Sequence, residues 1–125
     1  MTINIHQIAR NIAQTLTASE CSQPFGAQCD VYKILGKVYL MAFELNGIPI
    51  LNVKVDPQHG DMLRDFYPFI HTGYHMNKQH WISIYTHEAI TKELLEDLIQ
   101  SSYELVTSKL TKLQKQHLAT LKSMP

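Results

Sequence analysis

The dipeptide Asn46-Gly47 constrains what this chain can fold into more than any other pair of residues. Both residue types tolerate the positive φ angles of a type I′ turn, so Asn-Gly between two apolar runs is the strongest short-range signal for a β-hairpin. The runs 38–45 and 48–55 on either side of it are rich in β-branched, aromatic and other apolar residues. The sequence therefore predicts two antiparallel strands joined at Asn46-Gly47.

A third strand is expected over residues 31–35, followed by a tight reversal at Gly36-Lys37. Within 48–55, the alternation of side chains places apolar residues on one face of the sheet and Asn52 and Lys54 on the other. An antiparallel sheet can have one polar face, and that face must lie in water or against a partner.

Helical patterns flank these strands. Isoleucines and alanines recur at helical spacing over residues 4–18, where Asn4 can cap the first turn. Asp56-Pro57 is a typical helix start, with Asp56 as N-cap and Pro57 at the first helical position, and this helix is expected to end near residues 67–68. Its apolar side is expected to consist of Met62, Leu63 and Phe66.

Residues 81–85 are expected to form a further strand, and Thr91 is expected to cap a helix with leucines on its core side and an acidic outer face. After Leu105 the charge inverts, which predicts a short basic amphipathic helix as a tail over residues 106–125. Its leucines are expected to dock on the body, although a basic amphipathic helix can also lie on an anionic surface. The lysines of this tail are Lys109, Lys112, Lys115 and Lys122.

The 125 residues fit one domain over residues 1–125, of the α+β class, with an antiparallel sheet packed against N- and C-terminal helices. Eleven basic and eleven acidic side chains give zero net charge, which counts against strong nucleic-acid binding except through a local basic patch. The sequence has no apolar run long enough to cross a bilayer and no signal peptide, so we expect no membrane partner and a cytoplasmic location. Cys21 and Cys29 are expected to be free thiols.

The stretch 73–81 mixes aromatic, titratable and amide side chains more densely than any other. It holds the sole tryptophan, Trp81, which is expected to act as a structural anchor between the sheet and a helix. His71 and His75 are four residues apart, but residues 69–73 are expected to be extended or irregular and not helical. The stretch 73–81, which includes His80, holds no carboxylate, so no metal site is expected. The chain also lacks a nucleophile elbow, a phosphate loop and a dinucleotide fingerprint, so neither an enzyme nor a cofactor is expected.

Four segments carry a resemblance to a known family, namely 36–42, 53–57, 73–81 and 98–106. Together they resemble the MmcQ/YjbR family of small bacterial proteins, and the match extends over nearly the whole chain. Its most specific part is the His-Met-Asn-Lys run before Trp81. The resemblance implies a CyaY-like α+β domain, and the family is customarily called DNA-binding after a double-wing arrangement of its β-hairpins.

If the resemblance extends to function, residues at the turns and on the polar sheet face bind DNA. Lysines there would hold phosphates, while Asn77 or Gln79 would contact a base edge. The candidate residues for nucleic-acid binding are Lys33, Lys37, Lys54, His75, Asn77, Lys78, Gln79 and His80.

The alternative is a binding adaptor whose open sheet face or histidine-lined groove holds a protein partner or a small anion, without nucleic acid. Iron handling, which a CyaY-like fold suggests, ranks below both because residues 4–18 carry no acidic side chain. Either function is compatible with a monomer or a weak dimer.

Overall fold

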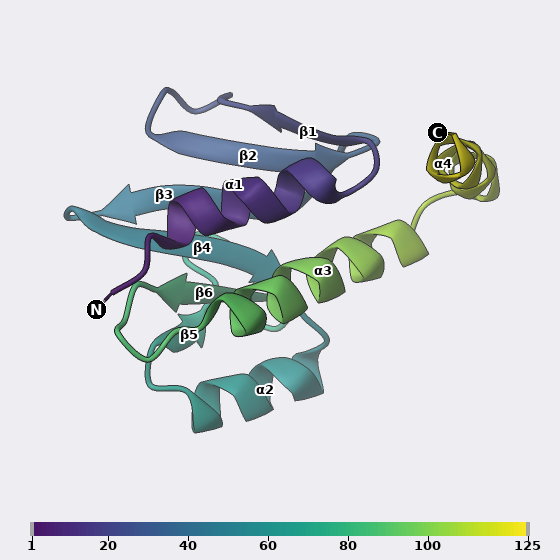
Figure 1. Cartoon of the computed structure of the whole chain (residues 1–125). Coiled ribbons are helices and arrows are strands. Elements are labelled where there is room, and N and C mark those ends of the chain that lie inside the picture. The colour runs from purple at the N-terminus through teal and green to yellow at the C-terminus, as the bar shows by residue number, and fades with distance from the viewer. Residues whose placement is uncertain (1, 125) are drawn as a thin grey trace.

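Six antiparallel strands form one sheet in the order β1-β2-β3-β4-β6-β5, and helices α1 and α3 lie across one of its faces (Figure 1). This computed structural model describes residues 2–124. The strands are β1 (Ser19–Ser22), β2 (Cys29–Ile34), β3 (Lys37–Leu45), β4 (Ile48–Lys54), β5 (Ile70–Thr72) and β6 (Trp81–Tyr85). The helices are α1 (Ile5–Thr15), α2 (Pro57–Phe66), α3 (Lys92–Ser108) and α4 (Lys112–Ser123). The predicted α+β class is confirmed.

The turn between β3 and β4 is the predicted one. Asn46 has φ 53° and Gly47 has φ 79°, which is the pair of positive φ angles that a type I′ turn requires. The turn between β2 and β3 uses the same geometry, with φ 47° at Leu35 and φ 82° at Gly36. This reversal lies one residue earlier than expected, because Lys37 already belongs to β3.

The hydrophobic core fills the space between the sheet and the two covering helices. Its fully buried members on the sheet include Leu40, Leu51, Val53, Ile82 and Ile84. Ile5 from α1 and Leu95 and Ile99 from α3 belong to the same cluster. The burial of Leu51 and Val53 confirms the apolar face that the alternation in 48–55 predicts.

One buried hydroxyl connects α3 to the middle of the sheet. Ser102 Oγ donates to the Tyr39 carbonyl at 2.6 Å and accepts from the Lys54 backbone N–H at 2.8 Å. The register between β2 and β3 shifts at this level, between Tyr32 and Lys33, so the backbone of Tyr39 lies at an irregular point of the ladder. Such irregular points leave backbone groups unpaired, and Ser102 satisfies them here.

The N-terminal helix is shorter than predicted. Asn4 Oδ1 accepts from the Gln7 N–H at 3.0 Å as the expected N-cap, but α1 ends at Thr15 instead of residue 18. The chain then reverses at Ala18, which has φ 62°, and continues as β1. This edge strand was not expected, because its four residues are polar and mostly exposed and carry no alternating pattern.

The boundary between the last two helices also differs from the prediction. Helix α3 continues to Ser108, so residues 106–108 belong to it, and α4 begins only after Thr111. A capping box between Thr111 and Gln114 starts the new helix. Of the tail leucines expected to dock, Leu118 is buried at 5% exposed, but the expectation is wrong for Leu113, which is 76% exposed.

Helix α2 has a narrower apolar side than expected. Leu63 is buried, but Met62 and Phe66 are exposed, because the helix contacts the body mainly through Gly60 and Leu63. A Cβ on Gly60 would lie 3.0 Å from Val55 Cγ2, which shows how closely the helix backbone approaches the sheet.

Candidate functional site

The segment between β5 and β6, residues 73–80, is closed by backbone hydrogen bonds at its base. The Gly73 N–H donates to the Trp81 carbonyl at 2.9 Å, and the Trp81 N–H donates to the Asn77 carbonyl at 3.1 Å. A Cβ on Gly73 would lie 2.6 Å from Trp81 Cβ, so only glycine fits at this crossing. We call residues 73–80 the closed loop.

The closed loop covers the sheet face opposite to the helices. The Tyr74 N–H donates to Ser83 Oγ at 2.8 Å, and Asn52 Nδ2 donates to the Tyr74 carbonyl at 3.1 Å. The Tyr74 ring stacks on Phe43, with ring centroids 5.9 Å apart. As a result Asn52 and Ser83 are buried, so the expectation of a polar face open to water or to a partner is wrong at its centre. The chain itself provides the polar cover.

Two of the predicted loop residues hold the loop in shape. Asn77 Oδ1 accepts from the backbone N–H of Gln79 at 2.9 Å and of His80 at 3.1 Å. Lys78 Nζ donates to the Gly73 carbonyl within the same loop. His75 has φ 57° and its ring lies edge-on to the Tyr74 ring, with centroids 4.2 Å apart, so it points toward Tyr74. Gln79 is exposed.

The structure brings three of the predicted residues together around one pocket of about 360 Å³. Lys54 comes from the end of β4, and Asn77 and His80 come from the closed loop. The same pocket is lined by Trp81 and by Lys109, which directly follows α3. Its remaining walls are Val55, Asp56, Pro57 and Leu105. We call this depression the Lys54–Lys109 pocket.

The sequence alone did not place Lys109 at this site, because Lys54 and Lys109 are far apart in the chain. They line one pocket only because α3 packs on the sheet. The available signal was the inversion of charge after Leu105, which marks the start of a basic segment. In the part of the chain that the structure describes, neither Lys54 nor Lys109 forms an ion pair. Asp56 is the acidic residue that lines the pocket, and its Oδ1 accepts from the Gln58 N–H at 3.0 Å.

Trp81 is half-buried and lies outside the cluster of buried core residues. It stands at the start of β6 beside Lys54, with which it pairs in the sheet. Trp81 therefore lies on the same sheet face as Lys54 and is one of the residues that line the pocket.

The lysines are concentrated at one end of the molecule. Strands β2 and β4 end there, β3 and β6 begin there, and the C-terminal end of α3 and the whole of α4 lie on the same side (Figure 1). We call this the lysine-rich end, and its lysines are Lys33, Lys37, Lys54, Lys78, Lys109, Lys112, Lys115 and Lys122. The remaining lysine, Lys92, starts α3 at the opposite end.

Acidic residues follow the opposite distribution. Those on elements at the far end from α4 are Asp30, Glu44, Glu88, Glu93, Glu96 and Asp97. On the elements of the lysine-rich end the acidic residues are Glu20, Asp56 and Glu104, while Asp61 and Asp65 lie along α2. The zero net charge of the chain therefore conceals a separation of positive and negative side chains.

The two turn lysines lie apart from the pocket but at the same end. Lys33 and Lys37 flank the turn between β2 and β3, and β3 separates β2 from β4 in the sheet. Two strand spacings, roughly 10 Å, therefore separate the backbones of Lys33 and Lys54. Glu20 lies opposite Lys33 in the β1–β2 register and offsets part of its charge.

The histidines of the predicted stretch do not gather around a common point. The His71 ring lies edge-on to the Tyr85 ring at 4.9 Å between centroids, and His75 contacts Tyr74. Among residues 2–124, no group of three or more His, Cys, Asp or Glu side chains is arranged to hold a metal ion.

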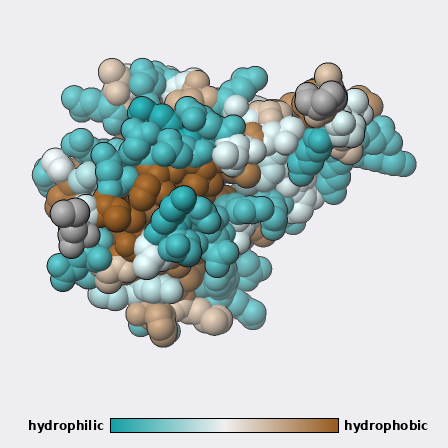
Figure 2. Space-filling view, in the orientation of Figure 1, coloured by the Kyte–Doolittle hydropathy of each residue, from teal (hydrophilic) through white to brown (hydrophobic). Residues whose placement is uncertain are grey.

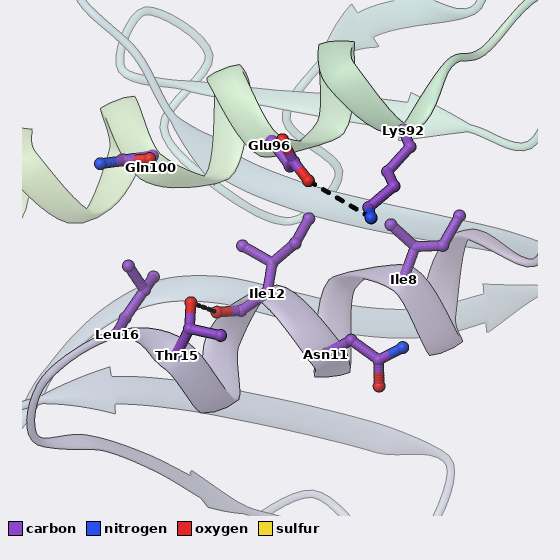
Figure 3. A pocket seen from close by; sticks show the side chains of 8 residues that line it. All are labelled: Ile8, Asn11, Ile12, Thr15, Leu16, Lys92, Glu96 and Gln100. Atoms are coloured by element: carbon purple, nitrogen blue, oxygen red, sulfur yellow. Dashed lines mark hydrogen bonds and ion pairs between the residues drawn. The ribbon is translucent and has the colours of Figure 1, made fainter.

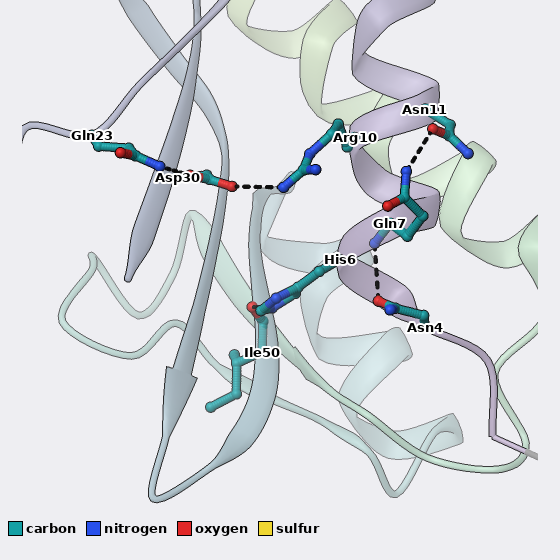
Figure 4. A network of polar contacts seen from close by, with 8 residues as sticks. All are labelled: Asn4, His6, Gln7, Arg10, Asn11, Gln23, Asp30 and Ile50. Carbon is teal, nitrogen blue, oxygen red and sulfur yellow. Dashed lines mark hydrogen bonds and ion pairs between the residues drawn. The ribbon is translucent and has the colours of Figure 1, made fainter. Parts of the chain in front are cut away.

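A separate polar network lies near the start of β2 (Figure 4). The Arg10 guanidinium lies 3.5 Å from an Asp30 carboxylate oxygen, and Gln23 Nε2 donates to the other oxygen at 2.8 Å. Burial, and secondly the charge of Asp30, raise the pKa of the thiols of Cys21 and Cys29. A raised pKa reduces the thiolate fraction, so neither cysteine is activated as a nucleophile.

A groove of about 330 Å³ runs between α1 and α3 on the helical side (Figure 3). Its floor is apolar and shows as a hydrophobic hollow in the surface (Figure 2). Ile8 and Ile12 of α1 and the C-cap residue Leu16 line one side of the groove. On the α3 side, Lys92 Nζ lies 3.7 Å from Glu96 Oε1. None of the predicted site residues lies in this groove.

The fold defines a class: small α+β proteins in which helices cover one face of an antiparallel sheet. In this chain Lys54 and Lys109 line a pocket at one end of that sheet. The family model of YjbR matches residues 14–105. The chain belongs to the YjbR family. This confirms the resemblance that the sequence segments carry.

Individual relatives agree with this assignment. The chain is 45% identical to the uncharacterized protein YbdF of Escherichia coli O157:H7 over 109 residues, which is 87% of this chain and 89% of YbdF. A crystal structure of the Deinococcus radiodurans protein DR2400 superposes with a TM-score of 0.80 at 34% identity, covering 88% of this chain and 84% of that one. A crystal structure of a Pseudomonas syringae protein gives a TM-score of 0.70 at 25% identity, covering 82% and 98% of the two chains. No helix within residues 2–124 has the length and apolar character needed to span a membrane.

Proposed function

We propose that this protein is a non-enzymatic nucleic-acid-binding protein that holds the phosphate backbone with its lysine-rich end. The observation that carries the proposal is the separation of charge along the sheet. Nearly all the lysines lie at the end where β4 meets β6 and α3 stops. A surface of this kind attracts a polyanion even when the net charge of the chain is zero.

Contacts between lysines and the phosphates of a nucleic acid supply affinity, because they release counterions from the nucleic acid. They carry little sequence information, because every phosphate presents the same oxygens. Binding is therefore expected to be modest, steeply dependent on salt and weakly dependent on sequence.

The lysines of this end divide into groups by their positions. Lys33 and Lys37 project from the β2–β3 turn, which forms the proposed wing. Lys54 and Lys109 line the pocket at the end of β4. The exposed lysines of α4 extend the same basic surface away from the sheet (Figure 1).

The arrangement of these side chains favours a binding function over catalysis. The pKa of each thiol is raised, and the best-connected polar groups, Asn52 and Ser83, are buried under the closed loop. The adaptor alternative relied on an open sheet face. Tyr74 of the closed loop covers the centre of that face, which makes this alternative less favoured.

Fluorescence anisotropy of a labelled duplex of about 20 base pairs tests the proposal at several salt concentrations. The double variant Lys37→Gln/Lys54→Gln is expected to bind more weakly, with a logarithmic salt slope reduced by about one for each phosphate that a lysine no longer neutralises. Its matched control is Arg10→Gln/Lys92→Gln, which also removes two positive charges but away from the lysine-rich end.

The control is expected to bind as the unchanged protein does. Absence of saturable duplex or single-strand binding at low salt contradicts the proposal and leaves the adaptor as the function to test. Equal losses in both double variants also contradict it, because they would show a dependence on net charge and not on this surface.

A further inference from the structure

We infer that the Lys54–Lys109 pocket takes a single unpaired nucleotide, with its base against Trp81 and its phosphate between the two lysines. The inference deepens the proposed function, since it names unpaired strands or strand ends as the preferred ligand. It has consequences for mononucleotides that hold whether or not the protein binds polymers.

The shape of the site favours a nucleotide over a duplex backbone. A duplex presents its phosphates along a convex edge and needs no concavity, whereas this site is a depression of about 360 Å³. That volume lies at the lower end of the range for small-molecule sites, about 300–1,000 Å³. The pocket combines an apolar wall with convergent polar groups, which is the usual make-up of such sites.

Trp81 provides the surface on which a base can stack. Its backbone is fixed at both sides of the residue, because its carbonyl accepts from the Gly73 N–H and it pairs with Lys54 in the sheet. The residue is only half-buried, it lines the pocket, and the strand register places it on the same sheet face as Lys54. An aromatic ring held on a rigid strand loses little freedom when a base stacks on it, and stacking accepts every base.

The two lysines are positioned from different elements and converge on the same pocket. Hydrogen bonding of the Lys54 N–H to Ser102 Oγ holds the end of β4 against α3. The Lys109 N–H donates to the Val106 carbonyl at 3.1 Å, which places this residue at the last turn of α3. Neither ammonium group forms an ion pair within residues 2–124, so both remain available for phosphate oxygens.

The other polar groups of the pocket suit the rest of a nucleotide. His80 and Asn77 line the pocket on the side of the closed loop. Asn77 Oδ1 is engaged by the backbone within the loop, which leaves its amide N–H groups as donors. Asp56 uses Oδ1 to cap α2, which leaves Oδ2 as an acceptor for a sugar hydroxyl or a base N–H. Donors and acceptors are thus both present, as a base edge requires.

The intrinsic fluorescence of Trp81, the sole tryptophan, gives a direct readout of the site. We expect thymidine and adenosine monophosphates to change its emission in a saturable way, while inorganic phosphate alone does not. In the same buffer a short single-stranded oligonucleotide is expected to bind about tenfold more tightly than a duplex of equal length, as the gain of one stacked base implies.

Trp81→Leu is expected to weaken single-strand binding about tenfold and to leave duplex binding unchanged. Trp81→Phe keeps an aromatic ring and is expected to retain most of the affinity, measured by anisotropy. Since position 81 also closes the loop, Lys54→Gln/Lys109→Gln serves as a second variant, at one half-buried and one exposed position. It should lower mononucleotide affinity at least about fivefold, with Trp81 as the probe, if each ammonium–phosphate hydrogen bond has its usual strength.

The outcomes separate this inference from the proposed function. Equal binding of single strands and duplexes, with unchanged Trp81 emission, overturns the inference and leaves the proposed function standing. Saturable mononucleotide binding without any polymer binding supports the inference and overturns the proposed function. A response to inorganic phosphate equal to the response to mononucleotides also overturns the inference, because the base then contributes nothing.

Discussion

The Ser83 hydroxyl donates a hydrogen bond of 2.5 Å to Asn52 Oδ1, across the neighbouring strands β4 and β6. Each partner also bonds the backbone of Tyr74, Ser83 through the Tyr74 N–H and Asn52 through the Tyr74 carbonyl. The pair therefore fixes one residue of the closed loop in both directions. Because the same loop carries Asn77 and His80 into the pocket, a buried polar pair in the sheet determines the geometry of a surface site.

Asn52→Ala is expected to lower the free energy of unfolding by about 1–3 kcal/mol. It leaves the Tyr74 carbonyl without its donor and the proton of the Ser83 hydroxyl without an acceptor, while Ser83 Oγ still accepts from the Tyr74 N–H. Urea unfolding at neutral pH measures the change. The control is Asn11→Ala, which removes one exposed hydrogen bond to Gln7 and is expected to change stability by less than about 0.5 kcal/mol.

Ser83→Ala combined with Asn52→Ala is expected to cost less than the sum of the two single changes, because both remove parts of one network. A strictly additive double variant would show that the two residues act independently. Any ligand of the Lys54–Lys109 pocket should also bind Asn52→Ala more weakly than the unchanged protein, since the loop is less well held.

Gly73→Ala is expected to destabilise the protein by about 3 kcal/mol, at the upper end of the effect of overpacking. The added Cβ would lie 2.6 Å from Trp81 Cβ and 3.0 Å from the Trp81 carbonyl oxygen, and neither atom is the end of a flexible side chain. Thermal unfolding followed by circular dichroism measures the loss.

Gly47→Ala is the matched comparison for this prediction. Nothing lies within 4 Å of its added Cβ, but its φ of 79° is unfavourable for alanine. It is expected to cost about 1 kcal/mol from backbone strain alone. A smaller loss for Gly73→Ala than for Gly47→Ala would contradict the close approach of residues 73 and 81.

The buried hydroxyl of Tyr39 is expected to make the free energy of unfolding fall as the pH rises above about 10. Burial raises the pKa of its hydroxyl to about 12, from an ordinary value of 10. Below about pH 10 the hydroxyl is protonated in both states, whereas between pH 10 and 12 the unfolded chain releases the proton and the folded chain keeps it. The unfolded state is thereby favoured as pH rises, by about 2–3 kcal/mol once the pH passes the folded pKa.

Tyr39→Phe tests this dependence by urea unfolding at pH 8 and at about pH 11. At pH 8 the variant is expected to be about 1 kcal/mol less stable, because it loses the hydrogen bond between Tyr39 and Ser19. At the higher pH the deficit should shrink, since the variant has no hydroxyl to ionise at that position. Tyr67→Phe, at a half-exposed position, is the control, and a constant deficit for Tyr39→Phe would contradict the prediction.

Local signals predicted the fold well where a turn or cap has its own chemistry. Asn46-Gly47 specified the hairpin, and Asp56-Pro57 specified the start of α2, because each acts through its own backbone angles and hydrogen bonds. The edge strand β1 was not predicted, since its pairing with β2 depends on where α1 ends and not on its own polar sequence.

The site was predicted only in part for a related reason. Residues within 73–81 are close in the chain, so the sequence could place Asn77 and His80 near Lys54 through a shared sheet. Lys109 reaches the same pocket because α3 continues to Ser108 and ends beside β4, which is a consequence of helix length and packing. The cover over Asn52 likewise depends on the path of the closed loop, which no periodicity encodes.

Leu118 lies on the face of α4 that packs against the body, and Leu113 lies on its solvent face. Leu118 is 5% exposed and Leu113 is 76% exposed. Leu118→Ala is therefore expected to cost about 2 kcal/mol, the lower end for a buried leucine, because α4 lies at the periphery. The loss of stability should be local, with faster amide hydrogen exchange confined to α4 and to the part of α3 that it contacts. One such contact places Lys122 Nζ of α4 5.6 Å from the centre of the Tyr103 ring of α3. Leu113→Ala should change neither stability nor exchange by a measurable amount, and equal effects of the two substitutions would contradict this docking of α4.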